Sequence, residues 1–135
     1  MFKYLKTIGA HTCAPEPEHI RVKTATVIKS GALCEMVDGY ISSSYTEGKS
    51  KFIALEEKAA GVYKRSIKCI RVLPGMLFEV AFIGEVNNIP AGSLVMPICS
   101  DYDNYLHCEE GTSGIEVVNT DSYETTGTIT VTIHR

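Results

Sequence analysis

The strongest constraint on the fold is an internal repeat, in which the same order of strand and turn signals occurs twice at an offset of about 61 to 63 residues. Each copy has a strand led by a glycine, a polar turn, a short apolar strand and a final alternating strand. The matched segments are 28–36 with 89–97, 51–55 with 114–118, and 66–72 with 128–134. The pattern predicts one β-domain over 28–135, whose two repeats, at about 28–75 and 89–135, bury their apolar faces against each other.

Short apolar or alternating runs, bounded by Gly, Pro, Ser, Asn and Asp, fill most of the chain and are typical of strands and turns. The clearest is 127–134, where Thr alternates with Ile or Val, so that one face packs on a core. One short helix is expected at 55–61, ended by Gly61. The expected fold is all-β, a compact β-barrel or sandwich built from two pseudo-repeated strand units. The predicted strands are 24–28, 32–37, 40–44, 51–54, 66–72, 76–83, 93–98, 105–108, 115–118 and 127–134.

Residues 1–27 lie outside the repeat and are predicted to form an extended N-terminal arm. Pro15 and Pro17 exclude a helix there, because each fixes φ and lacks a backbone donor. We expect the apolar side chains of the arm to lie against the sheet edge of a neighbouring subunit. These partner-binding candidates are Phe2, Tyr4, Leu5 and Ile8. The alternatives are a first strand of the domain followed by a loop, and a frayed terminus.

The charge is unevenly distributed along the chain, although the net charge is only −3. Residues 1–75 hold 12 Lys or Arg against 7 Asp or Glu, and residues 76–135 hold 1 against 9. The halves therefore carry +5 and −8, which suits a protein that docks in one orientation on a charged surface or on copies of itself. The small acidic net charge argues against nucleic acid as a partner. No run approaches the roughly 20 apolar residues of a membrane span, so no membrane partner is expected.

The residues that could carry catalysis or bind a metal do not form a recognised pattern. The five cysteines are scattered, with no CxxC pair, and are expected to be reduced thiols, two of them inside apolar runs. Two His/Cys groups, at 11–13 and 107–108, could supply four ligands, but their spacing matches no zinc signature. Asp101 and Asp103 are typical of a turn, and glycine-rich phosphate motifs are absent. We therefore expect no enzyme activity, no metal and no cofactor.

Four tyrosines cluster in corresponding loops of the two copies: Tyr40, Tyr45, Tyr102 and Tyr105. Tyrosine buries a large area at a small entropic cost and keeps a hydroxyl for the rim of an interface. We expect at least one pair of them to contact a partner. The competing interpretation is that they belong to the core.

Three segments resemble bacteriophage head decoration proteins, also called capsid cement proteins, which have compact β-barrel or β-tulip bodies. They are SGALCEMVDGY at 30–40, KFIALEEKAAG at 51–61 and SIKCIRV at 66–72. The resemblance spans about 28–135 and consists mostly of turn glycines and alternating apolar residues. It implies a structural virion protein, made in the host cytoplasm, that binds the outer capsid surface between major capsid protein subunits. It also implies partners, the major capsid protein and copies of the chain itself, and no catalytic residues.

Two other functions fit the same sequence. One is a different phage structural module of similar β build, such as a tail or connector component. The other is a small-ligand-binding β-barrel or barrel-type enzyme, which predicts a deep pocket with converging polar groups. A barrel interior filled by side chains would argue against the second.

Overall fold

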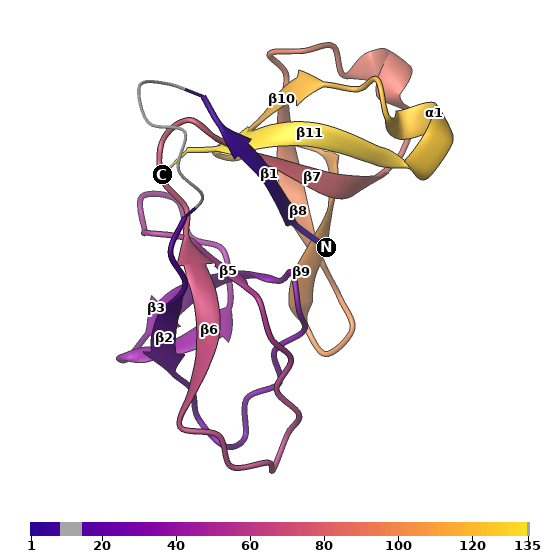
Figure 1. Ribbon diagram of the computed structural model, residues 1–135. Coiled ribbons are helices and arrows are strands. Elements are labelled where there is room, and N and C mark those ends of the chain that lie inside the picture. The colour runs from indigo at the N-terminus through magenta and orange to yellow at the C-terminus, as the bar shows by residue number, and fades with distance from the viewer. Residues whose placement is uncertain (9–14, 135) are drawn as a thin grey trace.

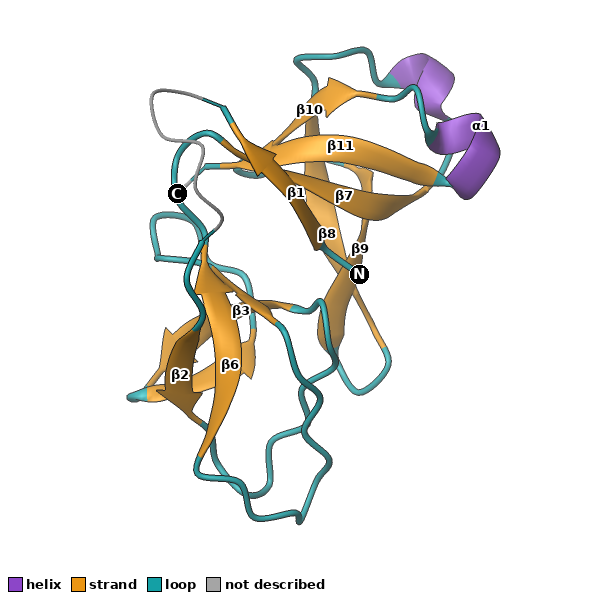
Figure 2. Ribbon diagram, viewed as in Figure 1, coloured by secondary structure: helices purple, strands orange, loops and turns teal. Residues whose placement is uncertain are grey.

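A computed structural model describes residues 1–8 and 15–134 and shows an all-β fold, with eleven strands and one short helix among those residues (Figures 1 and 2). The elements are β1 (Lys3–Thr7), β2 (Glu18–Arg21), β3 (Leu33–Val37), β4 (Tyr40–Ser43), β5 (Phe52–Ala54), β6 (Ser66–Arg71), β7 (Met76–Ile83), a 3-10 turn (Val86–Asn88), β8 (Leu94–Ser100), β9 (Asn104–Glu110), β10 (Ile115–Asn119), α1 (Tyr123–Thr126) and β11 (Thr128–Ile133). No helix in the described residues is long and apolar enough to cross a membrane.

The chain forms two five-stranded units with one topology. The first unit has the strand order β2-β6-β5-β3-β4, and the second has β7-β11-β10-β8-β9. All of these neighbours are antiparallel. The register repeats as well: Leu33 pairs with Ile53, and Val95 pairs with Ile115, each 62 residues later (33 to 95, 53 to 115). The two pseudo-repeated units predicted from the sequence are present, each with one more strand at its N-terminal end than predicted.

The turns that begin with a glycine explain why the repeat can be detected in the sequence. Gly31 and Gly92 have φ values of 81° and 92°, in the left-handed region that favours glycine. Each begins its strand with the same three main-chain hydrogen bonds. These are Gly31 N to Ala54 O, Ala32 N to Lys29 O and Ala54 N to Ala32 O in the first unit, and Gly92 N to Val117 O, Ser93 N to Pro90 O and Val117 N to Ser93 O in the second.

The second unit is a closed barrel, whereas the first is open. β7 and β9 pair in parallel, with Ala81 opposite His107 and Ile83 opposite Glu109, and this ladder closes the ring. The corresponding strands of the first unit, β2 and β4, lie side by side without a ladder. We call the line between them the β2–β4 seam.

The larger of two hydrophobic clusters contains residues of both units. Alternate residues of β3 face opposite ways: Leu33 packs with Phe78 in the core of the barrel, and Cys34 packs inside the first unit. Ile53 and Ile70 of the first unit also belong to the barrel core. The sheet is continuous through β3 and β9, which pair at Leu33 and Tyr105. The two pseudo-equivalent halves therefore share one continuous sheet and part of one core.

Three charged side chains are buried in the first unit. Glu35 and Lys51 form an ion pair with a Nζ–Oε2 distance of 3.0 Å, and both are fully buried. The Lys51 ammonium also donates to the carbonyls of Thr46 and Lys49. Lys58 donates to the carbonyls of Thr24, Thr26 and Ala59 at 2.6, 2.9 and 2.9 Å. Main-chain carbonyls thus satisfy lysines where the apolar core is small.

Residues 1–27 contribute two strands, so the first strand is part of the domain, as one of the alternatives held. β1 pairs with β7, and β2 pairs with β6. The ends of β1 are held by hydrogen bonds from Phe2 N to Gly31 O and from Ile8 N to Gly75 O. Residues 1–8 and 15–27 therefore do not form the predicted extended arm, because their strands pair within the same chain. Residues 9–14 lie outside the described part.

Two predictions of secondary structure were wrong. The segment 55–61 is not a helix, because the Lys58 main chain exchanges two hydrogen bonds with Ile28 and its ammonium is tied to carbonyls. The segment 24–28 forms turns and this single bridge rather than a strand. The one helix, α1, lies instead between β10 and β11, and Gly127 ends it at φ 70°. Tertiary contacts override helix propensity at 55–61.

Candidate interaction surface

The predicted contact residues of the N-terminal segment do not lie together on the surface. Phe2 is only 1% exposed and belongs to the barrel core, so it is not available to a partner. Tyr4 is half-buried, with its ring edge-on to Phe78 at a centroid distance of 6.1 Å. Leu5 and Ile8 are exposed. The prediction is wrong for Phe2, because the β1–β7 pairing turns this side chain into the core.

The four predicted tyrosines divide into two kinds. Tyr45 and Tyr105 are half-buried against the barrel core, and the Tyr45 hydroxyl accepts a hydrogen bond from Gly114 N at 2.6 Å. They join the two units of the molecule. Tyr40 is also half-buried but lies outside the barrel core, and Tyr102 is exposed. Each has a lysine ammonium over its ring, from Lys23 at 5.2 Å and Lys29 at 5.3 Å. Tyr102, at 73%, is the most exposed of the four.

The cysteines of the described residues are mostly buried, unreactive thiols. Burial raises the pKa of Cys34, and raises the pKa of Cys69 and Cys108 to about 12. His107 and Cys108 point to opposite faces of β9, His107 half-buried beside Ser100 and Cys108 in the core. The other predicted pair, His11 and Cys13, lies outside the described residues. No group of three metal-ligating side chains occurs in the part of the chain that is described.

The interior of the closed barrel is filled by side chains. Phe78, Val80 and Val131 are fully buried there, with Phe82 and Ile129 beside them. The hollows found among the described residues lie at the surface. One, of about 320 Å³, lies beside Lys29, Lys58 and Tyr102, but Lys58 uses its ammonium on three main-chain carbonyls.

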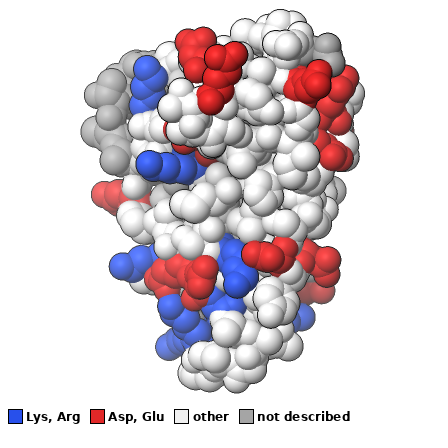
Figure 3. Space-filling model, turned by 90° about the vertical axis from the view of Figure 1, so that its right-hand side faces the viewer, with Lys and Arg blue, Asp and Glu red and all other residues white. Residues whose placement is uncertain are grey.

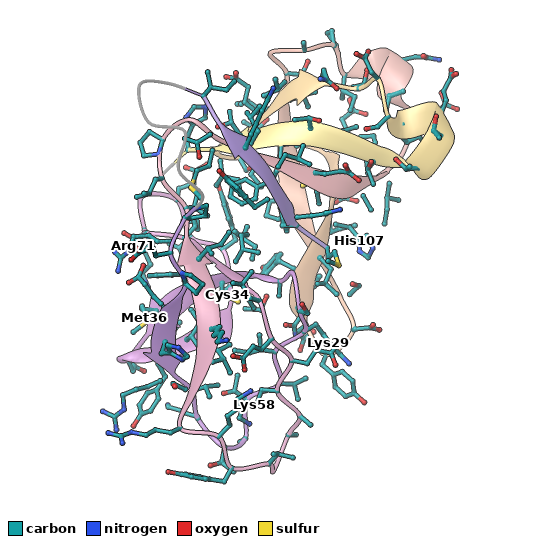
Figure 4. All side chains as sticks on the ribbon, in the orientation of Figure 1. Lys29, Cys34, Met36, Lys58, Arg71 and His107 are labelled. Atoms are coloured by element: carbon teal, nitrogen blue, oxygen red, sulfur yellow. The ribbon has the colours of Figure 1, made fainter. Side chains whose placement is uncertain are left out.

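Three neighbouring hollows lie on the first unit, and two of them are lined by β2 at the β2–β4 seam. Their volumes are about 340, 270 and 250 Å³. The first two share Met36, Phe52 and Arg71, and the second and third share Arg21. Figure 4 shows Met36 and Arg71 on the same side of the first unit, with Cys34 inside it. We call this feature the seam groove.

The seam groove is strongly basic. It is lined by six cationic side chains and one carboxylate, that of Glu18. The cations are Arg21, Lys23, Lys49, Lys64, Arg65 and Arg71. Glu18 accepts two hydrogen bonds from Arg71, both 3.0 Å long, and these lower the pKa of the Glu18 carboxyl. Lys64 pairs with Glu56, which lies outside the groove lining. Across residues 1–8 and 15–134, Arg21, Lys23, Lys49 and Arg65 form no ion pair with a carboxylate.

The strand order explains why cations far apart in the sequence meet here. Arg21 pairs with Ser66 in the β2–β6 ladder, so the segments 21–23 and 63–65 lie beside each other. Arg21 and Lys23 both lie over the ring of Tyr40, the guanidinium carbon at 5.4 Å and the ammonium nitrogen at 5.2 Å. On the face in Figure 3, most Lys and Arg side chains gather toward the first unit, at the lower end. The sequences RVK at 21–23 and YKR at 63–65 are the sequence signal for this basic surface, and the sequence analysis did not use them.

The second unit differs at the matching place. Its seam is closed by the β7–β9 ladder. Next to it, the loop that contains α1 packs Tyr123 edge-on to Phe82 at 6.4 Å, and the Tyr123 hydroxyl donates to Gly84 O at 2.6 Å. The groove is therefore a feature in which the two copies differ.

Comparisons of this chain with protein-family models, curated proteins and solved structures found no match.

Proposed function

We propose that the protein is a structural virion component that binds the outer surface of a phage capsid between major capsid protein subunits. The observation that carries the proposal is the seam groove, a basic surface on one half of a molecule whose other half is a closed, filled barrel. Modest contacts repeated over many copies can stabilise a shell. The resemblance of 30–40, 51–61 and 66–72 to capsid decoration proteins selects the capsid as the partner.

The charges of the two units support an oriented attachment. The first unit with its flanking loops, residues 15–75, has ten Lys or Arg and seven Asp or Glu. Residues 76–134 hold nine acidic residues and no Lys or Arg. An electric asymmetry of this kind turns the molecule as it approaches a charged surface and suppresses the reverse orientation. We infer that the first unit faces the capsid and the acidic second unit faces outward or toward another copy.

The test is binding to expanded capsids prepared without the protein, followed by measurement of their thermal rupture. We expect the protein to co-sediment with capsids at a fixed stoichiometry and to raise the rupture temperature. Arg21→Gln with Arg65→Gln should weaken the binding, whereas Lys3→Gln with Lys6→Gln removes the same charge from β1 and should not. Failure of the wild-type protein to bind expanded capsids would overturn the proposal.

The alternative of a tail or connector component predicts a different location in the same particle. Quantitative mass spectrometry of purified virions separates the two. Copies comparable in number to the major capsid protein support decoration, and a few copies per particle support a tail or connector role. The ligand-binding barrel has less support, because the interior of the closed barrel is filled by Phe78, Val80 and Val131.

A further inference from the structure

We infer that the seam groove binds an extended acidic peptide segment of the partner. This inference rests on the proposed function, because it names the chemistry of the segment through which the partner would be held. It is drawn from three features of the groove: its shape, its charge and its floor.

The shape suits an extended chain rather than a compact ligand. The hollow at Lys49 and Met36 adjoins a middle hollow lined by all four residues of β2, and this one adjoins the hollow at Lys23 and Arg65. β2 has four residues and thus a length of about 13 Å. β2 and β4 each have one edge without a ladder partner, so main-chain donors and acceptors lie at the rim. An extended peptide satisfies such groups by main-chain hydrogen bonds.

The charge selects acidic side chains. Four of the six cations that line the groove form no ion pair with a carboxylate of the described chain, as set out above. Arg21 and Lys23 are held near each other by the Tyr40 ring, although their charges repel. A carboxylate placed between them relieves that repulsion and gains charge-assisted hydrogen bonds. Arg71 already binds one carboxylate in this way, that of Glu18, with two bonds.

The groove also offers an apolar contact, which distinguishes a peptide from a nucleic acid. Met36 is 37% exposed in its floor, whereas Phe52 is buried beneath the Arg71 guanidinium, which lies 4.9 Å from the ring centroid. Alternate side chains of an extended peptide point to opposite sides, so apolar residues can contact this floor while acidic ones reach the cations at the rim. A phosphate backbone carries a charge on every nucleotide and has no aliphatic side chains that alternate with the charges to contact Met36.

The experiment uses the full chain and a fluorescein-labelled eight-residue peptide that alternates Glu and Val. Fluorescence anisotropy at low salt reports binding. We expect saturable binding that weakens at least tenfold in Arg21→Gln/Arg65→Gln. The matched control, Lys3→Gln/Lys6→Gln, should change the affinity less than twofold. Glu18→Gln removes the one carboxylate of the groove and should tighten binding about twofold to fivefold, since the peptide no longer competes for Arg71.

Several results would overturn the inference. These are no anisotropy change up to about 1 mM protein, equal weakening by the two double variants, or a 12-base-pair DNA duplex binding more tightly than the peptide. A loss of affinity in Glu18→Gln would also contradict it. Far-ultraviolet circular dichroism of each variant checks that these exposed substitutions leave the fold intact.

The outcome can be separated from that of the capsid proposal. Peptide binding without capsid binding supports the acidic-segment chemistry of the groove and refutes the capsid function. Capsid binding that survives Arg21→Gln/Arg65→Gln supports the function and refutes the groove as its contact.

Discussion

The two units of this protein share one strand order, yet one closes into a barrel and the other does not. The difference comes from strand length. β7 has eight residues, so its one edge pairs with β1 through Met76–Glu79 and with β9 through Ala81–Ile83. β2 and β4 have four residues each, and no ladder forms between them. The same topology therefore does not by itself close a barrel. The short strands β2 and β4 leave a groove between them, whereas the longer β7 pairs with β9 and closes the ring.

The two units also differ in what fills them. The barrel core contains Phe2, Phe78 and Phe82, and its buried polar residues, Asn104, Ser113 and Thr130, are uncharged. The first unit has a smaller apolar cluster and instead buries Glu35, Lys51 and Lys58. Buried charges are costly unless they are paired, and one of the two Glu35 oxygens, Oε1, has no hydrogen-bond partner in the described part of the chain. We therefore expect the first unit to depend on a few polar contacts and the second on packing.

The largest effect is expected in the closed unit, from Phe78→Ala. Phe78 is fully buried in the core that both units share, and truncating such a side chain costs about 3–5 kcal/mol of unfolding free energy. Because Leu33, Ile53 and Ile70 pack in the same cluster, both units should lose stability together. Urea denaturation followed by circular dichroism and tyrosine fluorescence measures this. Two separate transitions in the variant would show that the units are energetically independent.

Next in size is the effect of Lys51→Met in the open unit. This change leaves the Glu35 carboxylate buried without its cation, and we expect a loss of about 3 kcal/mol in unfolding free energy. The matched control is Arg71→Met, which removes the exposed Glu18–Arg71 pair and should cost less than about 1 kcal/mol. Equal costs would mean that burial of the pair has no energetic consequence.

The pH dependence of stability gives an independent check of the same pair. Burial alone raises the pKa of Glu35, but hydrogen bonds from Lys51 and Thr46 outweigh it, so this pKa is lowered. A carboxyl with a lowered folded pKa stabilises the protein above its unfolded pKa of about 4.5, and this contribution is lost as the pH falls through the folded pKa. We expect Lys51→Met to lose this acid sensitivity, since protonation then relieves an unpaired charge. Parallel stability curves for the two proteins between pH 6 and about pH 3 would contradict this.

A smaller effect is expected from Lys58→Met, which removes three hydrogen bonds to main-chain carbonyls. Charge-assisted bonds of this kind contribute appreciably, and we expect a loss of about 2 kcal/mol, confined largely to the loops 23–28 and 57–61. Amide hydrogen exchange should show faster exchange in these two loops. Lys29→Met is the control, because its ammonium lies over the exposed Tyr102 ring in the same hollow. Faster exchange in the barrel strands as well would contradict a local role.

The repeat, and with it most strands, could be predicted because turn glycines such as Gly31 and Gly92 fix the same local bonds in both copies. The course of 55–61 could not be predicted, since the bonds of Lys58 to distant carbonyls outweigh its local helix preference. A compact barrel was one of the two architectures expected, but the strands that close it could not be predicted, because the parallel β7–β9 pairing joins residues about 26 positions apart (81 to 107) without a sequence signal.

The seam groove could not be predicted for a related reason. Its cations come from 21–23, 49, 63–65 and 71, and only the β2–β6 pairing brings the first and third of these groups together. The tyrosines were visible in the sequence, but which of them are exposed depends on packing. Tyr45 is held by Gly114, while Tyr40 lies at the seam.

The smallest effect is a difference in local opening between the two units, measured by the buried thiols. Cys34 and Cys69 lie inside the open unit, and Cys108 lies on β9 in the closed barrel. All three thiols are buried, so a thiol reagent reaches them only when the structure opens. Burial also raises the pKa of each thiol, which keeps it protonated until then. In a Cys99→Ser background, which removes an exposed thiol, we expect Cys34 and Cys69 to be labelled about tenfold faster than Cys108, a difference of about 1.4 kcal/mol. Mass spectrometry of the digested protein assigns each label. Equal rates would mean that the unpaired seam costs the first unit nothing in stability, and faster labelling of Cys108 would mean that the β7–β9 closure is the weaker part of the molecule.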